Sequence, residues 1–153
     1  MIYDYEINSS TMAIIPIDKN QSKVYEEDSE YIVNKSSNDI IKYNCKFYGS
    51  SYQGRCEGTK YMTGIKSKYP IIIEESRNII FFPTTSSRTQ QSSWIALNKI
   101  RKINLSNMPY ESQLVFKNDL KLTMNISKYS LENQFCRATM LKSKLYENKI
   151  QEK

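Results

Sequence analysis

Short apolar runs separated by polar turn residues dominate this sequence, and they restrict the chain to a fold built mainly on β-strands. In two places only the polar residues 76–78 or 117–119 separate a pair of such runs. Connections this short join neighbouring antiparallel strands, whereas parallel strands need a long crossover. The predicted strands are residues 3–8, 11–17, 69–75, 79–83, 93–105, 111–116 and 120–126. Residues 22–33 are predicted to form either one further strand or a pair of strands around an acidic turn.

Two other segments repeat their apolar residues at the spacing of a helix. A short helix is predicted over 38–48, where Ser37 and Asn38 could cap the start and Gly49 suits the left-handed residue that ends it. A long amphipathic helix is predicted over about 130–149. Its inward face is formed by Leu131, Phe135, Ala138, Leu141 and Leu145.

These patterns predict one α+β domain over residues 1–153, in which a mostly antiparallel, strongly curved sheet carries the two helices. Trp94, Phe81 and Phe82 are expected in or next to the core. No apolar run approaches the roughly 18–20 residues that cross a membrane, and the N-terminus lacks the pattern of a signal peptide. We therefore expect a cytoplasmic protein with no membrane partner.

The residue types of the chain exclude most catalytic chemistry. The sequence contains no histidine, so Ser–His and Cys–His nucleophile pairs and histidine metal ligands are impossible. Its three cysteines form no C-x-x-C pair, which favours reduced thiols over a zinc site. Residues 49–54 have the glycine spacing of a phosphate-binding loop, but Arg55 and Cys56 replace the Lys-Ser/Thr that completes it. We predict that the protein is no enzyme and uses no cofactor or metal.

Charge is distributed unevenly along the chain. Residues 1–39 contain eight acids and three lysines, a net charge of −5, and residues 40–153 contain 19 bases and eight acids, a net charge of +11. A surface this positive favours nucleic acid, an anionic membrane or an acidic protein as partner. Solvated lysines from an A/T-biased genome are the alternative explanation, and charge alone does not separate the two.

All four glycines lie within residues 49–64, among cationic and aromatic side chains. Glycine reaches positive φ easily and lets another molecule approach the backbone closely, so this segment is predicted to be a loop that binds a polyanion. The polar loop 84–93 and the basic residues at 99–102 follow it. The sequence shows no helix-turn-helix with a basic recognition helix, so we expect loops or strands to meet DNA if DNA is the ligand.

Several ordered segments also resemble a known family. They are YEINSSTMAIIPI (5–17), CKFYGSSYQGRCEGT (45–59), FFPTTSS (81–87), SWIAL (93–97) and ISKYSLENQFCRATML (126–141). In composition and order they resemble motifs of the competence transcription factor family, ComK, of Gram-positive bacteria. The resemblance covers nearly the whole chain.

The resemblance implies a cytoplasmic transcriptional activator of DNA-uptake genes. Members of the family bind paired A/T-rich boxes, largely through the minor groove, as two dimers acting as a tetramer. The implied partners are therefore A/T-rich double-stranded DNA, further copies of the chain, RNA polymerase and an adaptor that delivers family members to a Clp protease. Longer members continue past the last helix, whereas this chain ends at residues 148–153, so we expect activation or adaptor recognition to be altered.

The individual contact residues are predicted on physical grounds rather than carried over from the family. Arginine is favoured in the narrow minor groove of A/T-rich DNA, so Arg55 and Arg88 are predicted to enter the groove. Lysines and hydroxyls typically contact the DNA backbone. The predicted backbone contacts are Lys46, Lys60, Lys66, Lys99, Arg101 and Lys102 with Ser50 and Ser51, and close backbone approach is predicted at Gly49, Gly54 and Gly58.

Two alternatives to a DNA-binding activator remain open at this stage. The chain could be a tailless ComK relative that acts as a protein-interaction module and modulates a full-length partner through its acidic first 39 residues. Its twelve tyrosines also allow an RNA or single-strand binder, because aromatic rings stack on exposed bases.

Overall fold

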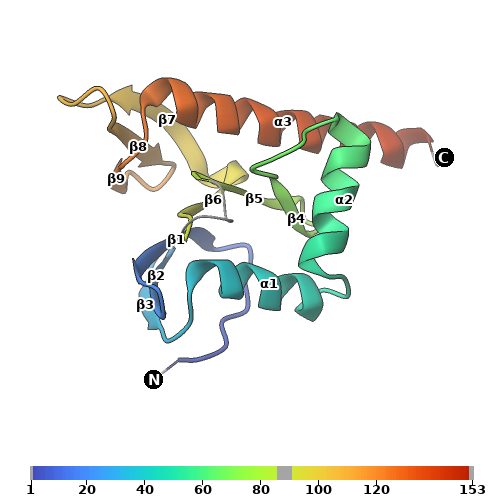
Figure 1. Ribbon diagram of the computed structural model, residues 1–153, viewed down its shortest axis with the longest axis horizontal. Helices are drawn as coiled ribbons and strands as arrows, with labels where there is room; N and C mark the ends of the chain where they lie inside the picture. Colours follow the sequence, from blue (N-terminus) through green and yellow to red (C-terminus); the bar gives the residue numbers. More distant parts are fainter. Residues whose placement is uncertain (1, 86–90, 152–153) are drawn as a thin grey trace.

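The computed structural model describes residues 2–85 and 91–151 and has the α+β architecture that the sequence predicts (Figure 1). Its named strands pair antiparallel in two sheets, and three α-helices pack against them. The elements are β1 (Thr11–Asp18), β2 (Gln21–Glu26), β3 (Glu30–Val33), α1 (Ser37–Phe47), α2 (Tyr52–Thr63), β4 (Ile71–Glu74), β5 (Ile79–Pro83), β6 (Trp94–Ala96), the 3-10 helix η1 (Leu97–Lys99), β7 (Ile100–Leu105), β8 (Ser112–Phe116), β9 (Lys121–Met124) and α3 (Lys128–Gln151).

The larger sheet contains the core of the molecule. Its six strands have the order β3-β2-β1-β6-β5-β4. Successive residues of a strand point to opposite faces. Accordingly, Phe81 packs with Trp94 in the cluster that includes α1, and Phe82 packs with Ile95 in the cluster that includes α3. The three aromatic residues predicted for the core are fully buried, which confirms that expectation.

The smaller sheet has the order β7-β8-β9 and lies under the N-terminal half of α3 (Figure 1). The predicted strand 93–105 is divided between the sheets, because β6 pairs with β1 and β5 whereas β7 pairs with β8. A continuous apolar run does not indicate which partner each half will take, so the sequence predicted one curved sheet where the chain forms two. The long C-terminal helix is confirmed and begins two residues earlier than predicted, at Lys128.

Residues 3–8, predicted as a strand, form none. The side-chain amide of the buried Asn44 in α1 takes the place of a neighbouring strand: it donates to the Tyr5 carbonyl oxygen (2.8 Å) and accepts the Ile7 N–H (2.8 Å). The Tyr48 hydroxyl donates to the Ile7 carbonyl oxygen (2.6 Å). The backbone groups of this segment are therefore satisfied by side chains, and Tyr5 and Ile7 still reach the core.

The predicted helix over 38–48 is confirmed as α1, but its cap is different. Ser36 is the N-cap, and its hydroxyl accepts the Asp39 N–H (3.2 Å). Ser37 and Asn38 were expected to cap the helix, yet both are buried and bind β6 and the residues before it. The Ser37 hydroxyl donates to the Ser92 carbonyl oxygen (2.6 Å), and the Trp94 indole donates to Asn38 (2.9 Å). These bonds fix α1 to the larger sheet.

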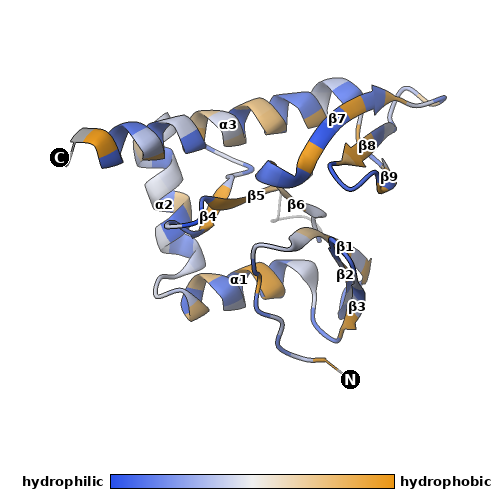
Figure 2. Cartoon of the chain, turned by 180° about the vertical axis from the view of Figure 1, so that it is seen from behind, coloured by the Kyte–Doolittle hydropathy of each residue, from blue (hydrophilic) through white to orange (hydrophobic). Residues whose placement is uncertain are grey.

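The glycine-rich segment is a helix rather than a loop. Residues Tyr52–Thr63 form α2, which is capped by Ser51 and ends at Gly64 with φ of +79°. Only Thr59 of this helix is buried, and Figure 2 colours α2 mainly white and blue. Because the helix has almost no apolar face, hydrophobic periodicity could not reveal it.

No helix within the described residues is both long and apolar enough to cross a membrane.

Candidate nucleic-acid interface

α1 and α2 follow each other directly and form the centre of the candidate interface. The turn between them covers residues 48–51. Gly49 in this turn has φ of +87°, as predicted for a residue that ends a helix, and its N–H donates to the Lys46 carbonyl oxygen (3.0 Å). Consecutive helices joined by a short glycine-containing turn recur in DNA-binding proteins. The sequence predicted a loop in place of α2, so this helix pair emerges only from the structure.

The exposed lysines of residues 36–70 form what we call the basic α1–α2 surface: Lys42, Lys46, Lys60, Lys66 and Lys68. None of them forms an ion pair with another residue in 2–85 or 91–151. Residues 36–70 contain six bases and two acids, a net charge of +4. An uncompensated positive surface of this kind attracts a polyanion.

The loop that follows α2 is held in place by α3. The Gln134 side-chain amide donates to the Lys68 carbonyl oxygen (3.1 Å), and the Arg137 guanidinium donates to the Ser67 carbonyl oxygen (2.5 Å). Lys66 and Lys68 are therefore presented on a backbone that is bonded to the long helix. Lys66, a predicted backbone contact, and Lys68 are both exposed.

The predicted cations of the 99–102 segment belong to a different part of the molecule. Lys99 is paired with Glu27 and Arg101 with Asp119, so neither charge is free. Lys102 is exposed on β7 and has no ion-pair partner among the described residues. In Figures 1 and 2, β7 and α2 lie toward opposite ends of α3. The structure therefore divides the predicted contact set into two groups.

Arg55 lies in the first turn of α2 and is half-buried, so its predicted position in a loop was wrong. Its side chain lines a groove of about 230 Å³ between α2 and the end of α3. The guanidinium Nε is buried there and has no hydrogen-bond acceptor. The role of Arg55 in the minor groove stays a prediction, and Arg88 lies outside the described residues.

Gly54 and Gly58, for which close backbone approach was predicted, are helical residues of α2. A Cβ built at Gly58 would meet no atom within 4 Å, and one at Gly54 would lie 3.1 Å from the Ser51 hydroxyl oxygen. The Ser51 hydroxyl accepts the Gly54 N–H (3.0 Å) and thereby caps the helix, while Ser50 lines the groove beside Arg55. Ser51 is exposed, so its hydroxyl also remains accessible to a ligand.

Aromatic rings lie next to the lysines at the end of α1. The Tyr43 and Phe47 rings stack with centroids 6.2 Å apart, and the edge of Tyr48 meets Phe47 at 5.0 Å. Half of the Phe47 surface is exposed (51%), although a phenylalanine has no polar group to place in water. Phe47 belongs to the apolar spacing that predicts the helix over 38–48, and the tertiary structure shows that its ring is half-exposed.

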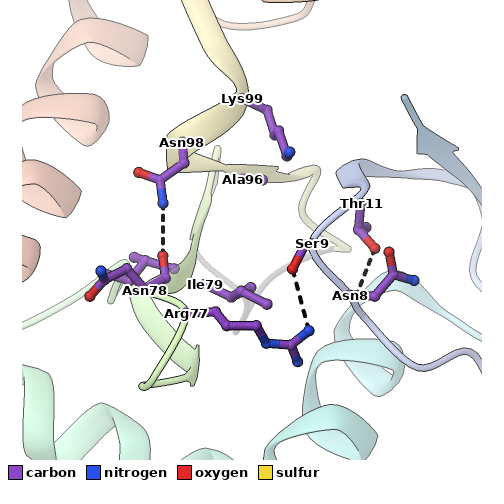
Figure 3. Close-up of a pocket in the computed structure, with 10 residues that line it drawn as sticks. Asn8, Ser9, Thr11, Arg77, Asn78, Ile79, Ala96, Asn98 and Lys99 are labelled. Atoms are coloured by element: carbon purple, nitrogen blue, oxygen red, sulfur yellow. Dashed lines mark hydrogen bonds between the residues drawn. The ribbon is translucent and has the colours of Figure 1, made fainter. Parts of the chain in front are cut away.

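A second polar site is a pocket of about 150 Å³ between the start of β1, the β4–β5 turn and η1 (Figure 3). Arg77 donates to the Ser9 hydroxyl (3.3 Å), and Asn98 donates to the Asn78 carbonyl oxygen (2.9 Å). Its two cations, Arg77 and Lys99, are both paired with carboxylates. The pocket is therefore less suited to phosphate than the basic α1–α2 surface.

The pKa values of Glu74 and Cys45 are shifted by hydrogen bonding and by burial, respectively. Hydrogen bonds from the Ser76 hydroxyl and then from Arg77 lower the pKa of Glu74 to about 2, although its partial burial acts in the opposite direction. Burial raises the pKa of the Cys45 thiol to about 12, so this thiol is neutral near pH 7. All three cysteines are free.

Comparison with known proteins identifies the family. The sequence profile of the ComK family, described as ComK protein, matches residues 2–150. The chain belongs to the ComK family. Within it, the competence transcription factor of Bacillus subtilis (strain 168) is 36% identical to this chain over 143 residues, which cover 92% of this chain and 74% of the relative. No solved structure matches the chain. The family resemblance inferred from the ordered motifs is thereby confirmed.

Proposed function

We propose that this ComK family member is a competence transcription factor that binds A/T-rich double-stranded DNA in the cytoplasm through the basic α1–α2 surface. The observation that carries the proposal is the set of five exposed lysines without carboxylate partners among the described residues, in a segment with a net charge of +4. Lysines that neutralise phosphates supply most of the affinity for duplex DNA. The name of the Bacillus subtilis relative supports the role in competence.

A preference for A/T-rich sequence needs a second element besides charge. A/T tracts have a narrow minor groove with enhanced negative potential, into which arginine inserts. Arg55 supports such a role because its buried Nε lacks an acceptor among the described residues. A bound duplex would supply that acceptor after a change of the Arg55 rotamer. We expect Arg55 to determine sequence preference and the lysines to determine affinity.

Equilibrium binding to paired A/T boxes and to a G/C-rich duplex of equal length, at two salt concentrations, tests the proposal. We expect tighter binding to the A/T boxes at matched salt. Lys60→Ala is expected to weaken both duplexes similarly and to reduce the salt slope by about 1. Lys144→Ala is the matched control, because Lys144 is a helical lysine that is paired with Glu147. Equal affinity for both duplexes would refute the sequence preference, and equal effects of the two variants would refute the assigned surface.

The alternative of a protein-interaction module receives less support. It was motivated by the acidic first 39 residues, but three of these acids are paired within the chain: Asp4 with Lys35, Glu27 with Lys99 and Glu30 with Lys23. Fewer free carboxylates are then left for a basic partner. Self-association into a dimer or tetramer, and contact with RNA polymerase or a Clp-protease adaptor, stay predictions from the family resemblance.

A further inference from the structure

Phe47 is an exposed but ordered apolar ring at the end of α1. Its ring is held between Tyr43, which stacks on it at 6.2 Å with 29° between the planes, and Tyr48, whose edge meets it at 5.0 Å. Tyr48 is itself fixed by the bond from its hydroxyl to the Ile7 carbonyl oxygen (2.6 Å). The open half of the Phe47 ring therefore loses little conformational freedom when it enters a binding site.

Lys42 and Lys46 place exposed positive charge beside the ring, and the Lys42 ammonium lies over the Tyr52 ring, 5.9 Å from its centroid. Lys42 and Lys46 lie one helical turn apart on α1, each directly before a residue of the Tyr43–Phe47 pair, and both are exposed. Neither lysine pairs with a carboxylate among residues 2–85 and 91–151. The apolar ring thus stands within the same basic α1–α2 surface to which we assign DNA.

We propose that Phe47 is a wedge that inserts between two neighbouring base pairs of the bound duplex, with Lys42 and Lys46 on the phosphates that flank the step. The inference rests on the proposed function and adds to it a distortion of the DNA. Minor-groove proteins use apolar wedges in this way, and the unstacking is offset by the additional contacts that the kinked duplex allows. T-A steps unstack most easily, so a T-A step within an A/T box is the expected target.

Like charge disfavours a second copy of the chain on this surface. A symmetric contact through Phe47 would place the Lys42 and Lys46 side chains of both copies close together, and like charges repel at such distances. A polyanion neutralises the same lysines and offers flat apolar base surfaces for the ring. The charge around Phe47 therefore favours nucleic acid over self-association.

The experiment uses a duplex of paired A/T boxes with 2-aminopurine at a T-A step, because the fluorescence of this base increases on unstacking. The wild-type chain is expected to increase the signal. Phe47→Ala is expected to remove the increase and to weaken binding about tenfold, whereas Phe47→Leu retains part of both effects. Tyr61→Ala is the matched control, because Tyr61 on α2 is an aromatic residue with 92% exposure outside the ring cluster, and it is expected to behave as wild type.

Changing the duplex sequence instead of the protein tests the proposal independently. Replacing the T-A step by A-A is expected to weaken wild-type binding and to leave binding of Phe47→Ala unchanged, since that variant has no wedge to insert. Circular dichroism checks that each variant is folded. If the wild-type chain prefers the A/T duplex but causes no fluorescence increase at any T-A step, the wedge is refuted and the proposed function stands. If it binds no duplex at all, both are refuted.

Discussion

Asn44 makes the most specific prediction about stability, because one buried side chain replaces a strand partner. Its amide is fully buried and serves the Tyr5 carbonyl oxygen, the Ile7 N–H and the Ile40 carbonyl oxygen, each at 2.8 Å. The Ile40 carbonyl already takes part in the helix. Asn44→Ala therefore leaves two backbone groups of the N-terminal segment without a partner inside the protein.

The expected magnitude follows from these two groups. A buried backbone group without a partner costs about 1–3 kcal/mol, so Asn44→Ala is expected to lower the free energy of unfolding by about 2–6 kcal/mol. Asn44→Leu removes the same bonds with a side chain of similar volume. If the bonds rather than the lost volume set the effect, both variants lose a similar amount.

Urea denaturation followed by circular dichroism measures this loss. With a slope of about 2 kcal/mol per molar urea, the midpoint is expected to fall by roughly 1–3 M. Asn133→Ala is the control, because Asn133 is an exposed asparagine of α3. A loss below about 0.5 kcal/mol for Asn44→Ala, or a value equal to the control, would show that the N-terminal segment is not held by this amide.

Three further predictions concern the supports of the candidate interface. Glu74→Gln is expected to destabilise the β4–β5 turn at pH 7. Hydrogen bonds, of which the one from the Ser76 hydroxyl has the largest effect, lower the pKa of Glu74 from its ordinary 4.5 to about 2. The stabilisation is therefore complete above pH 4.5 and is lost as the pH falls toward 2, so the unfolding curves of wild type and variant should converge in that range. Gln134→Ala leaves the buried Pro83 carbonyl oxygen without its donor at 2.8 Å. The free energy of unfolding, measured by thermal unfolding, is expected to fall by about 1–3 kcal/mol. No change would mean that another group donates to the Pro83 carbonyl oxygen. Ser51→Ala removes the N-cap of α2 and is expected to lower the free energy of unfolding by about 1 kcal/mol. The helical circular dichroism signal is expected to fall slightly. An unfolding transition identical to that of the wild type would show that the cap is dispensable.

The candidate site was predictable to the extent that its residues carry local signals. Lys46, Lys60 and Lys66 were predicted as contacts from their proximity to the glycines, and the structure places all three on the exposed surface. The helical state of the glycine segment was missed, although Ser51 before it and Gly64 after it are standard start and stop residues. The ion pair between Lys99 and Glu27 could not be predicted, because no local pattern relates residues so far apart in the chain.

Phe47 shows why sequence alone assigns burial poorly at the end of a helix. It continues the apolar spacing of α1, in which Ile40 and Ile41 are buried, yet it is half-exposed at the last residue of the helix. Asn44 shows the opposite case, since a polar residue within the same helix is fully buried. Both outcomes depend on which segment packs against α1, and that is a long-range property.

The sequence by itself determined the α+β class, most of the strands, the long C-terminal helix and the ComK family, because alternation, turn residues and ordered motifs are local patterns. Only the tertiary structure decided that the strands divide into two sheets, that α2 follows α1 as a helix, and that Lys46 and Lys60 are free whereas Lys99 and Arg101 are paired. The physical reason is that strand pairing and charge compensation depend on residues distant in the chain, and a local sequence pattern carries no information about which distant residues will meet.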